Sequence, residues 1–119
     1  MVTNFDDFTK ELNAKELAIV PAIIKGFSKY TKENPIKAPQ IVSRYNFNVK
    51  KGNIKLTQPR LRKICNYIRS YGMLPLIATS KGYYVSFDKE DIKLQITSLN
   101  ERANSIENCA KGLAEFLKL

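Results

Sequence analysis

The stretch that decides the fold is Leu56 to Ser86, "LTQPRLRKICNYIRSYGMLPLIATSKGYYVS", in which a helical pattern passes directly into a hairpin pattern. Thr57 is a good N-cap, and Pro59 suits the first turn of a helix, where its missing N–H costs nothing. Apolar residues then recur at i, i+3, i+4 and i+7, which predicts a helix from about 57 to 71 with one buried stripe. The stripe consists of Leu61, Ile64, Cys65 and Ile68.

The second half of this stretch predicts a β-hairpin. "LPLIA" is apolar and "YYVSF" is rich in aromatic and β-branched residues, and "TSKG" between them is a turn. Upstream, Asn13 and Glu16 have the spacing of a capping box at the start of a helix from about 14 to 32. A short helix is expected after Pro39, and Asp88 is expected to cap a helix that runs nearly to the end of the chain.

These patterns predict a mainly α fold with a small β-hairpin and a long C-terminal amphipathic helix. The expected organisation is a short N-terminal arm or helix over residues 1–12, a folded domain over 13–87 and a C-terminal helix over 88–119, the last for packing or dimerisation. The chain of 119 residues is enough for one small domain.

The order helix, short strand, helix, helix, strand, turn, strand resembles the winged-helix variant of the helix-turn-helix, a DNA-binding domain. The segment "RLRKICNYIR" with "LPLIATSKGYYVS", followed by a helix containing "SLNERANSI", is similar to small phage or prophage-type winged-helix proteins. The link from Phe47 to Leu56 is longer than the tight turn of a compact helix-turn-helix, so it either holds a strand or touches the partner itself.

Charge is concentrated in the middle of the chain. The net charge is +9, and residues 21–87 hold thirteen lysines and arginines against the single carboxylate of Glu33. Residues 1–20 and 88–119 are slightly acidic. A block this cationic repels itself, and a polyanion that neutralises it becomes a favourable partner.

Several classes of function are disfavoured. The chain has no histidine and only two distant cysteines, which removes His-based catalysis and Cys-rich zinc sites, and it has no phosphate-binding glycine loop. We therefore expect a protein that is not an enzyme and has no metal or other cofactor. No apolar run is long enough for a membrane span and no secretory signal is evident, so we expect a cytoplasmic protein without a membrane partner.

The basic middle block and the winged-helix resemblance together predict binding to nucleic acid, with double-stranded DNA expected, in a transcription-regulatory or replication-associated role. The resemblance implies that the helix at 57–71 enters the major groove and that the wing at 79–83 lies on the adjacent backbone. Arg62 and Asn66 are the first candidates for base edges, with Gln58 as a third. Phosphate contacts are expected from Arg44, Lys50, Lys51, Lys55, Arg60, Lys63, Arg69 and Lys81. For Arg44 a salt bridge inside the domain is the alternative.

The last helix carries a heptad seam. Its apolar positions alternate at spacings of four and three, and they are Ile92, Ile96, Leu99, Ala103, Ile106, Ala110, Leu113 and Leu117. The seam either packs on the first helix of its own chain or pairs with a partner helix, most simply in a homodimer. The alternative function is a protein-interaction module, a phage-type inhibitor or recruiter of a host protein that uses this helix. A DNA-binding accessory subunit of an enzyme is a further reading.

Overall fold

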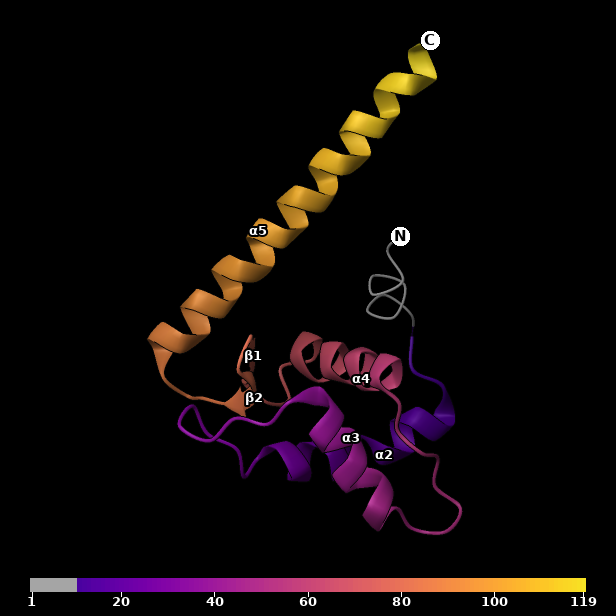
Figure 1. Cartoon of the computed structure of the whole chain (residues 1–119), viewed down its shortest axis with the longest axis vertical. Coiled ribbons are helices and arrows are strands. Elements are labelled where there is room, and N and C mark those ends of the chain that lie inside the picture. The colour runs from indigo at the N-terminus through magenta and orange to yellow at the C-terminus, as the bar shows by residue number, and fades with distance from the viewer. Residues whose placement is uncertain (1–10) are drawn as a thin grey trace. The chain divides into compact units, whose positions relative to one another are not determined.

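The computed structural model describes residues 11–119 and confirms the predicted fold class, mainly helical with a two-stranded hairpin and a long C-terminal helix (Figure 1). The predicted arm at 1–12 lies almost entirely outside the described residues. The chain divides into two compact units, which we call the core unit (Met1–Ser86) and the helical unit (Phe87–Leu119). The core unit holds α2 (Ala14–Phe27), α3 (Ala38–Asn48), α4 (Gln58–Ser70), β1 (Leu76–Thr79) and β2 (Gly82–Val85).

Helix α2 begins with the predicted capping box. The Asn13 side chain accepts a hydrogen bond from the Glu16 backbone N–H at 2.8 Å, and Glu16 Oε1 accepts one from the Asn13 N–H at 3.0 Å. The helix continues through Pro21, which is exposed, and ends at Phe27, earlier than the predicted end near residue 32. The backbone N–H and the hydroxyl of Ser28 both donate to the Ile24 carbonyl, which closes the last turn at this point.

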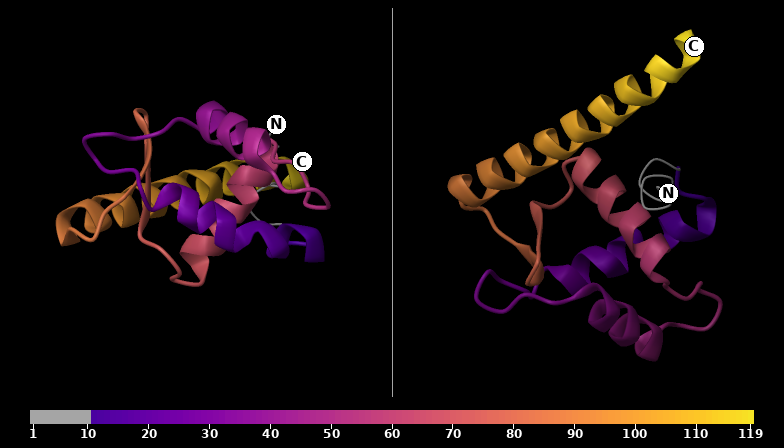
Figure 2. Two further views of the ribbon diagram at one scale, coloured as in Figure 1. Left: turned by 90° about the horizontal axis from the view of Figure 1, so that it is seen from below. Right: turned by 45° about the horizontal axis from the view of Figure 1, so that its top comes forward.

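Helices α2, α3 and α4 pack against one another in pairs, as Figure 2 shows for the core unit. The predicted apolar stripe of α4 is fully buried, and Thr57 caps the helix by accepting from the Arg60 N–H at 3.3 Å. The core that these helices share also includes Ile19, Ile23, Phe27, Ile41 and Leu56.

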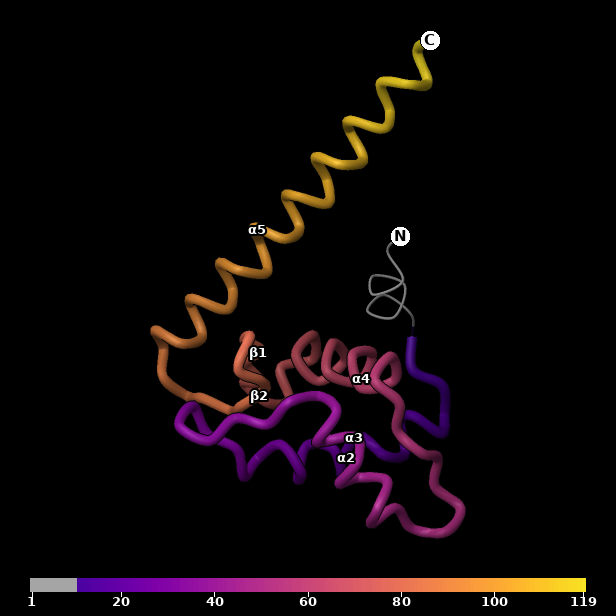
Figure 3. The backbone as a smooth tube through the Cα atoms, viewed as in Figure 1, coloured from indigo at the N-terminus to yellow at the C-terminus, as the bar shows by residue number. Residues whose placement is uncertain are grey.

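The link between α3 and α4 is an irregular loop, visible in the backbone trace of Figure 3. One side chain closes its two ends. The Asn46 amide donates to the Leu56 carbonyl at 2.9 Å and accepts from the Leu56 N–H at 2.7 Å. The loop therefore leaves and returns to fixed points of the core, although it contains no strand.

The hairpin pairs β1 and β2 antiparallel, in the register Leu76↔Val85 to Thr79↔Gly82. The predicted short strand near residue 36 takes part as a single bridge. Ile36 and Tyr83 exchange both backbone hydrogen bonds, at 2.9 and 2.7 Å. The bridge ties the segment between α2 and α3 to the second strand of the hairpin.

The helical unit consists of α5 (Lys89–Ala114) and a short 3₁₀ turn (Glu115–Lys118). The predicted cap is present, because the Asp88 side chain accepts from the backbone N–H of Glu90 at 2.8 Å and of Asp91 at 3.4 Å. From Ile96 onward, every residue of the heptad seam is exposed.

The Ile36–Tyr83 bridge makes a specific prediction about Gly82. Its φ is +128°, and a Cβ atom there would lie 2.6 Å from the Ile36 carbonyl oxygen. Gly82→Ala should lower the free energy of unfolding by about 2–3 kcal/mol, because both strain and a backbone clash are introduced. Urea denaturation followed by circular dichroism measures this loss.

Gly52→Ala is the matched control, since Gly52 also has a positive φ, of +92°, but has nothing within 4 Å of the added Cβ. It should cost only about 1 kcal/mol. Equal losses for the two variants would show that the bridge does not constrain the hairpin.

Candidate nucleic-acid interface

The predicted DNA-reading face of α4 is only partly accessible. Gln58 is exposed at the N-terminal end of the helix. The other predicted contact residues of this helix are half-buried, and they are Arg60, Arg62, Lys63, Asn66 and Arg69. Their roles as base or phosphate contacts stay predictions.

Two of these cations have a counter-ion inside the core unit. Glu16, at the start of α2, is buried, with 2% of its surface exposed. Its carboxylate accepts from Arg60 Nε at 3.0 Å and lies 2.8 Å from Lys63 Nζ. Arg60 also donates to the Lys55 carbonyl at 2.8 Å. Binding a phosphate through Arg60 or Lys63 therefore requires competition with an existing ion pair.

The protonation state of Glu16 follows from these contacts. Burial raises the pKa of the carboxyl group, but the hydrogen bonds from Lys63, the Asn13 backbone and Arg60 lower it more. The net result is a pKa below the ordinary value, so Glu16 is ionised at neutral pH. Arg60 and Lys63 thus share one internal counter-charge, which balances one of their two positive charges.

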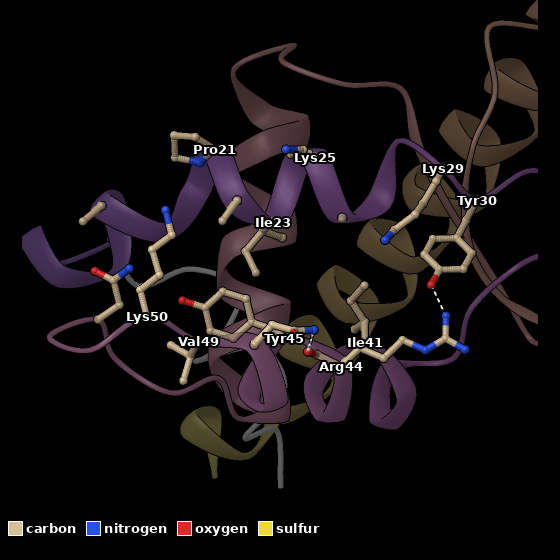
Figure 4. Close-up of a pocket in the computed structure, with 15 residues that line it drawn as sticks. Pro21, Ile23, Lys25, Lys29, Tyr30, Ile41, Arg44, Tyr45, Val49 and Lys50 are labelled. Atoms are coloured by element: carbon tan, nitrogen blue, oxygen red, sulfur yellow. Dashed lines mark hydrogen bonds between the residues drawn. The ribbon is translucent and has the colours of Figure 1, made fainter.

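A second cationic surface lies between α2 and α3, which we call the α2–α3 groove. It is an open cavity of about 470 Å³, shown with its lining residues in Figure 4. Among residues 11–119, the cations that line it are Lys25, Lys29, Arg44 and Lys50, and no carboxylate does. Uncharged residues make up the rest of the lining, which includes Pro21, Ile23, Ile41, Tyr45 and Val49.

Two aromatic residues fix one side of this groove. Arg44 donates a hydrogen bond to the Tyr30 hydroxyl and its guanidinium carbon lies 5.8 Å from the Tyr30 ring centroid (Figure 4). The alternative considered for Arg44 was a salt bridge in the domain; among residues 11–119, Arg44 instead donates to a neutral hydroxyl and has no carboxylate within ion-pair distance. Tyr45 donates to the Ile54 carbonyl at 3.3 Å, which holds the loop after α3 against the groove.

The lysines of the groove have no internal counter-ion. Among residues 11–119, no carboxylate lies within ion-pair distance of Lys25, Lys29 or Lys50. Four unmatched cations that share one concave surface form an attractive position for a polyanion. This surface therefore carries more positive charge without a carboxylate partner than the part of α4 next to Glu16.

The predicted contact residues are thus divided between places. Arg44 and Lys50 meet in the α2–α3 groove, Lys51 and Lys55 are exposed on the following loop, and Lys81 is exposed at the hairpin tip. Sequence reasoning missed Lys25 and Lys29 as site residues. Their spacing of four on the polar side of the first helix was the available signal.

The groove and the contact with α4 lie on neighbouring sides of α2. Ala18, Ala22 and Lys25 line the groove, whereas Glu16 contacts α4 through its ion pairs. On a helix with 3.6 residues per turn, Ile23 points in nearly the same direction as Glu16 and also lines the groove.

Cys65 and Tyr83 lie together in the core unit, away from the groove lining. Burial raises the pKa of the Cys65 thiol to about 12. Burial also raises the pKa of the Tyr83 hydroxyl, which is hydrogen-bonded to Cys65, to about 12. Within residues 11–119 no three His, Cys, Asp or Glu side chains gather as a metal site. No helix in that range has the length and apolarity that a membrane crossing requires.

Comparison with protein-family models, with curated proteins and with solved structures finds no match to this chain. The winged-helix resemblance therefore rests on the order of elements and on the quoted segments alone.

The Glu16 contacts predict a pH-dependent loss of stability. At pH 7, Glu16→Gln should lower the free energy of unfolding by about 2 kcal/mol, because charge-assisted hydrogen bonds from Arg60 and Lys63 are weakened. The contribution of the ionised carboxyl is present above its unfolded-state pKa and is lost as the pH falls through its lower folded-state pKa. Urea midpoints measured from pH 7 to pH 3 should therefore converge for the two proteins at the acid end.

Glu90→Gln is the control, because the Glu90 side chain is 78% exposed and its Oε1 lies 3.7 Å from the Nζ of Lys93, which is itself exposed. This change should leave the core unit within about 0.5 kcal/mol of the wild type at every pH. A Glu16→Gln difference that persisted unchanged at pH 3 would contradict the ionised state of Glu16.

Proposed function

We propose that this chain is a non-enzymatic nucleic-acid-binding protein, with double-stranded DNA as the expected ligand and a regulatory or replication-associated role. The observation that carries the proposal is the α2–α3 groove, in which four cations meet without a carboxylate. Phosphates of the nucleic-acid backbone supply the opposite charges at high density. Lys51 and Lys55 are exposed on the loop that follows α3 and add further positive charge to the core unit.

The groove is a phosphate-binding surface rather than a base-reading one. Lysine ammonium groups bind phosphate as point charges, and such contacts position a protein on a duplex without reading its sequence. The predicted base contacts from α4, through Gln58, Arg62 and Asn66, belong to a different docking mode. In that mode the helix enters the major groove and Lys81 of the wing meets the neighbouring backbone.

The charge balance favours the α2–α3 groove over α4 as the phosphate-binding surface. At α4, Arg60 and Lys63 are held by Glu16, so a phosphate would replace contacts that already exist. At the groove, a phosphate would meet unmatched lysines and release counter-ions, which is the main source of affinity for nucleic acid.

The first test removes three charges from the groove. In Lys25→Gln/Lys29→Gln/Lys50→Gln, affinity for a DNA duplex should fall at least tenfold at about 0.1 M salt, measured by fluorescence anisotropy. The slope of log K against log salt should become shallower by about 2–3, because each lost phosphate contact removes roughly 0.9 from it.

The matched control, Lys89→Gln/Lys93→Gln/Lys111→Gln, removes the same charge from exposed positions of α5. It should retain nearly all affinity. If both triple variants lose affinity equally, binding depends on overall charge and the groove is not the site.

Variants of α4 and of the hairpin separate the two docking modes. Binding through the groove predicts that Arg62→Ala and Lys81→Ala change affinity by less than about threefold, since neither residue lines the groove. If Arg62→Ala instead relaxes base preference while the groove triple variant binds normally, then α4 is the reading helix. If the affinity for the DNA duplex does not depend on salt at all, the nucleic-acid proposal is wrong.

A further inference from the structure

The exposed seam of α5 is a second candidate interaction surface. The exposed fractions of its large residues are 51% for Ile96, 37% for Leu99, 36% for Ile106, 70% for Leu113 and 87% for Leu117. In water, most of the stability of a helix comes from packing its apolar face against another element. A row of exposed apolar side chains this long is expected to pack against another protein surface.

We infer that the partner is a second copy of this chain and that the two copies pair antiparallel through the α5 seam. The seam spacings of four and three read the same in both directions along the helix. When one helix is reversed, the six seam positions from Ile96 to Leu113, all inside α5, therefore meet seam positions of the second copy. Ile96 then faces Leu113, and Ala103 faces Ile106.

Side-chain volume favours the antiparallel arrangement. In it, each seam alanine faces a large residue, Ala103 against Ile106 and Ala110 against Leu99. In a parallel pair, alanine layers would alternate with Leu and Ile layers that hold the helices apart, which leaves gaps. A parallel pair would gain a contact between Arg102 and Glu107, but exposed ion pairs contribute little.

Charge supports both the partner and the orientation. Residues 88–119 carry five basic and six acidic groups, so two copies of α5 meet with little net repulsion. The core unit is strongly cationic, and a parallel pair would attach both core units at one end. In the antiparallel pair, the two α5 start points lie about 45 Å apart at 1.5 Å per residue. That separation is several times the Debye length of about 10 Å at 0.1 M salt.

The first measurement is the mass of the full chain in solution, by light scattering without nucleic acid. At micromolar concentration the wild type should have twice the monomer mass of 13.6 kDa. Leu99→Lys/Ile106→Lys should be monomeric, while its urea transition shows that the core unit remains folded. The control Leu94→Lys/Asn108→Lys, which adds the same charges on the outer side of α5, should stay dimeric.

The second measurement tests the orientation in a Cys109→Ser background. A mixture of Leu99→Cys and Ala110→Cys chains should form a mixed disulfide under mild oxidation, because these positions face each other only in the antiparallel pair. Rapid crosslinking of Leu99→Cys to itself would overturn the antiparallel arrangement. A monomeric wild type, as expected if the seam packs on its own chain, or a complex with a different protein, would overturn self-pairing. No outcome depends on nucleic-acid binding.

Discussion

The core unit depends on the carboxylate of Glu16. It accepts from the Asn13 backbone N–H at the start of its own helix and binds Arg60 and Lys63 of α4. A buried charge is stable only when it is paired and hydrogen-bonded, so the carboxylate requires α4 to lie across the beginning of α2. That constraint directs the stripe around Leu61 and Ile64 into the core, where both side chains are fully buried.

The same pairing decides which positive charges are available to a ligand. The middle of the chain has a large excess of cations, and two of them are paired with the single carboxylate of Glu16, which lies outside that segment. Lys25, Lys29 and Lys50 are not matched in this way and line the α2–α3 groove. The net charge of the chain thus conceals two populations, one that holds helices together and one that faces solvent.

Local signals explain how much of the fold was predictable. The capping box at Asn13, the stripe of α4 and the hairpin around Lys81 are short-range patterns, and the structure confirms them. The early end of α2 was not predicted, because no glycine or proline follows Phe27 before Pro35 to indicate it. The partners of Glu16 were missed for a different reason, since they lie more than forty residues away in the chain and no local pattern connects them.

The sequence indicates which segment is basic but not which of its side chains lie together. A charge count finds the basic segment, but it cannot show which of its members share a surface. Arg44 and Lys50 were predicted as phosphate contacts and lie in the groove, whereas Lys25 and Lys29 join them only because α2 and α3 pack side by side.

The Asn46 clamp on Leu56 has a consequence for how this protein can diverge. Because one side chain joins the two ends of the α3–α4 loop, the helices do not sense the length of the chain between them. Adding several residues to such a closed loop costs only about 0.5 kcal/mol of closure entropy. Lys50 and Asn53 of this loop also line the groove. Insertions here would change the shape and charge of the groove while the scaffold stays intact, so this loop is where relatives should differ first.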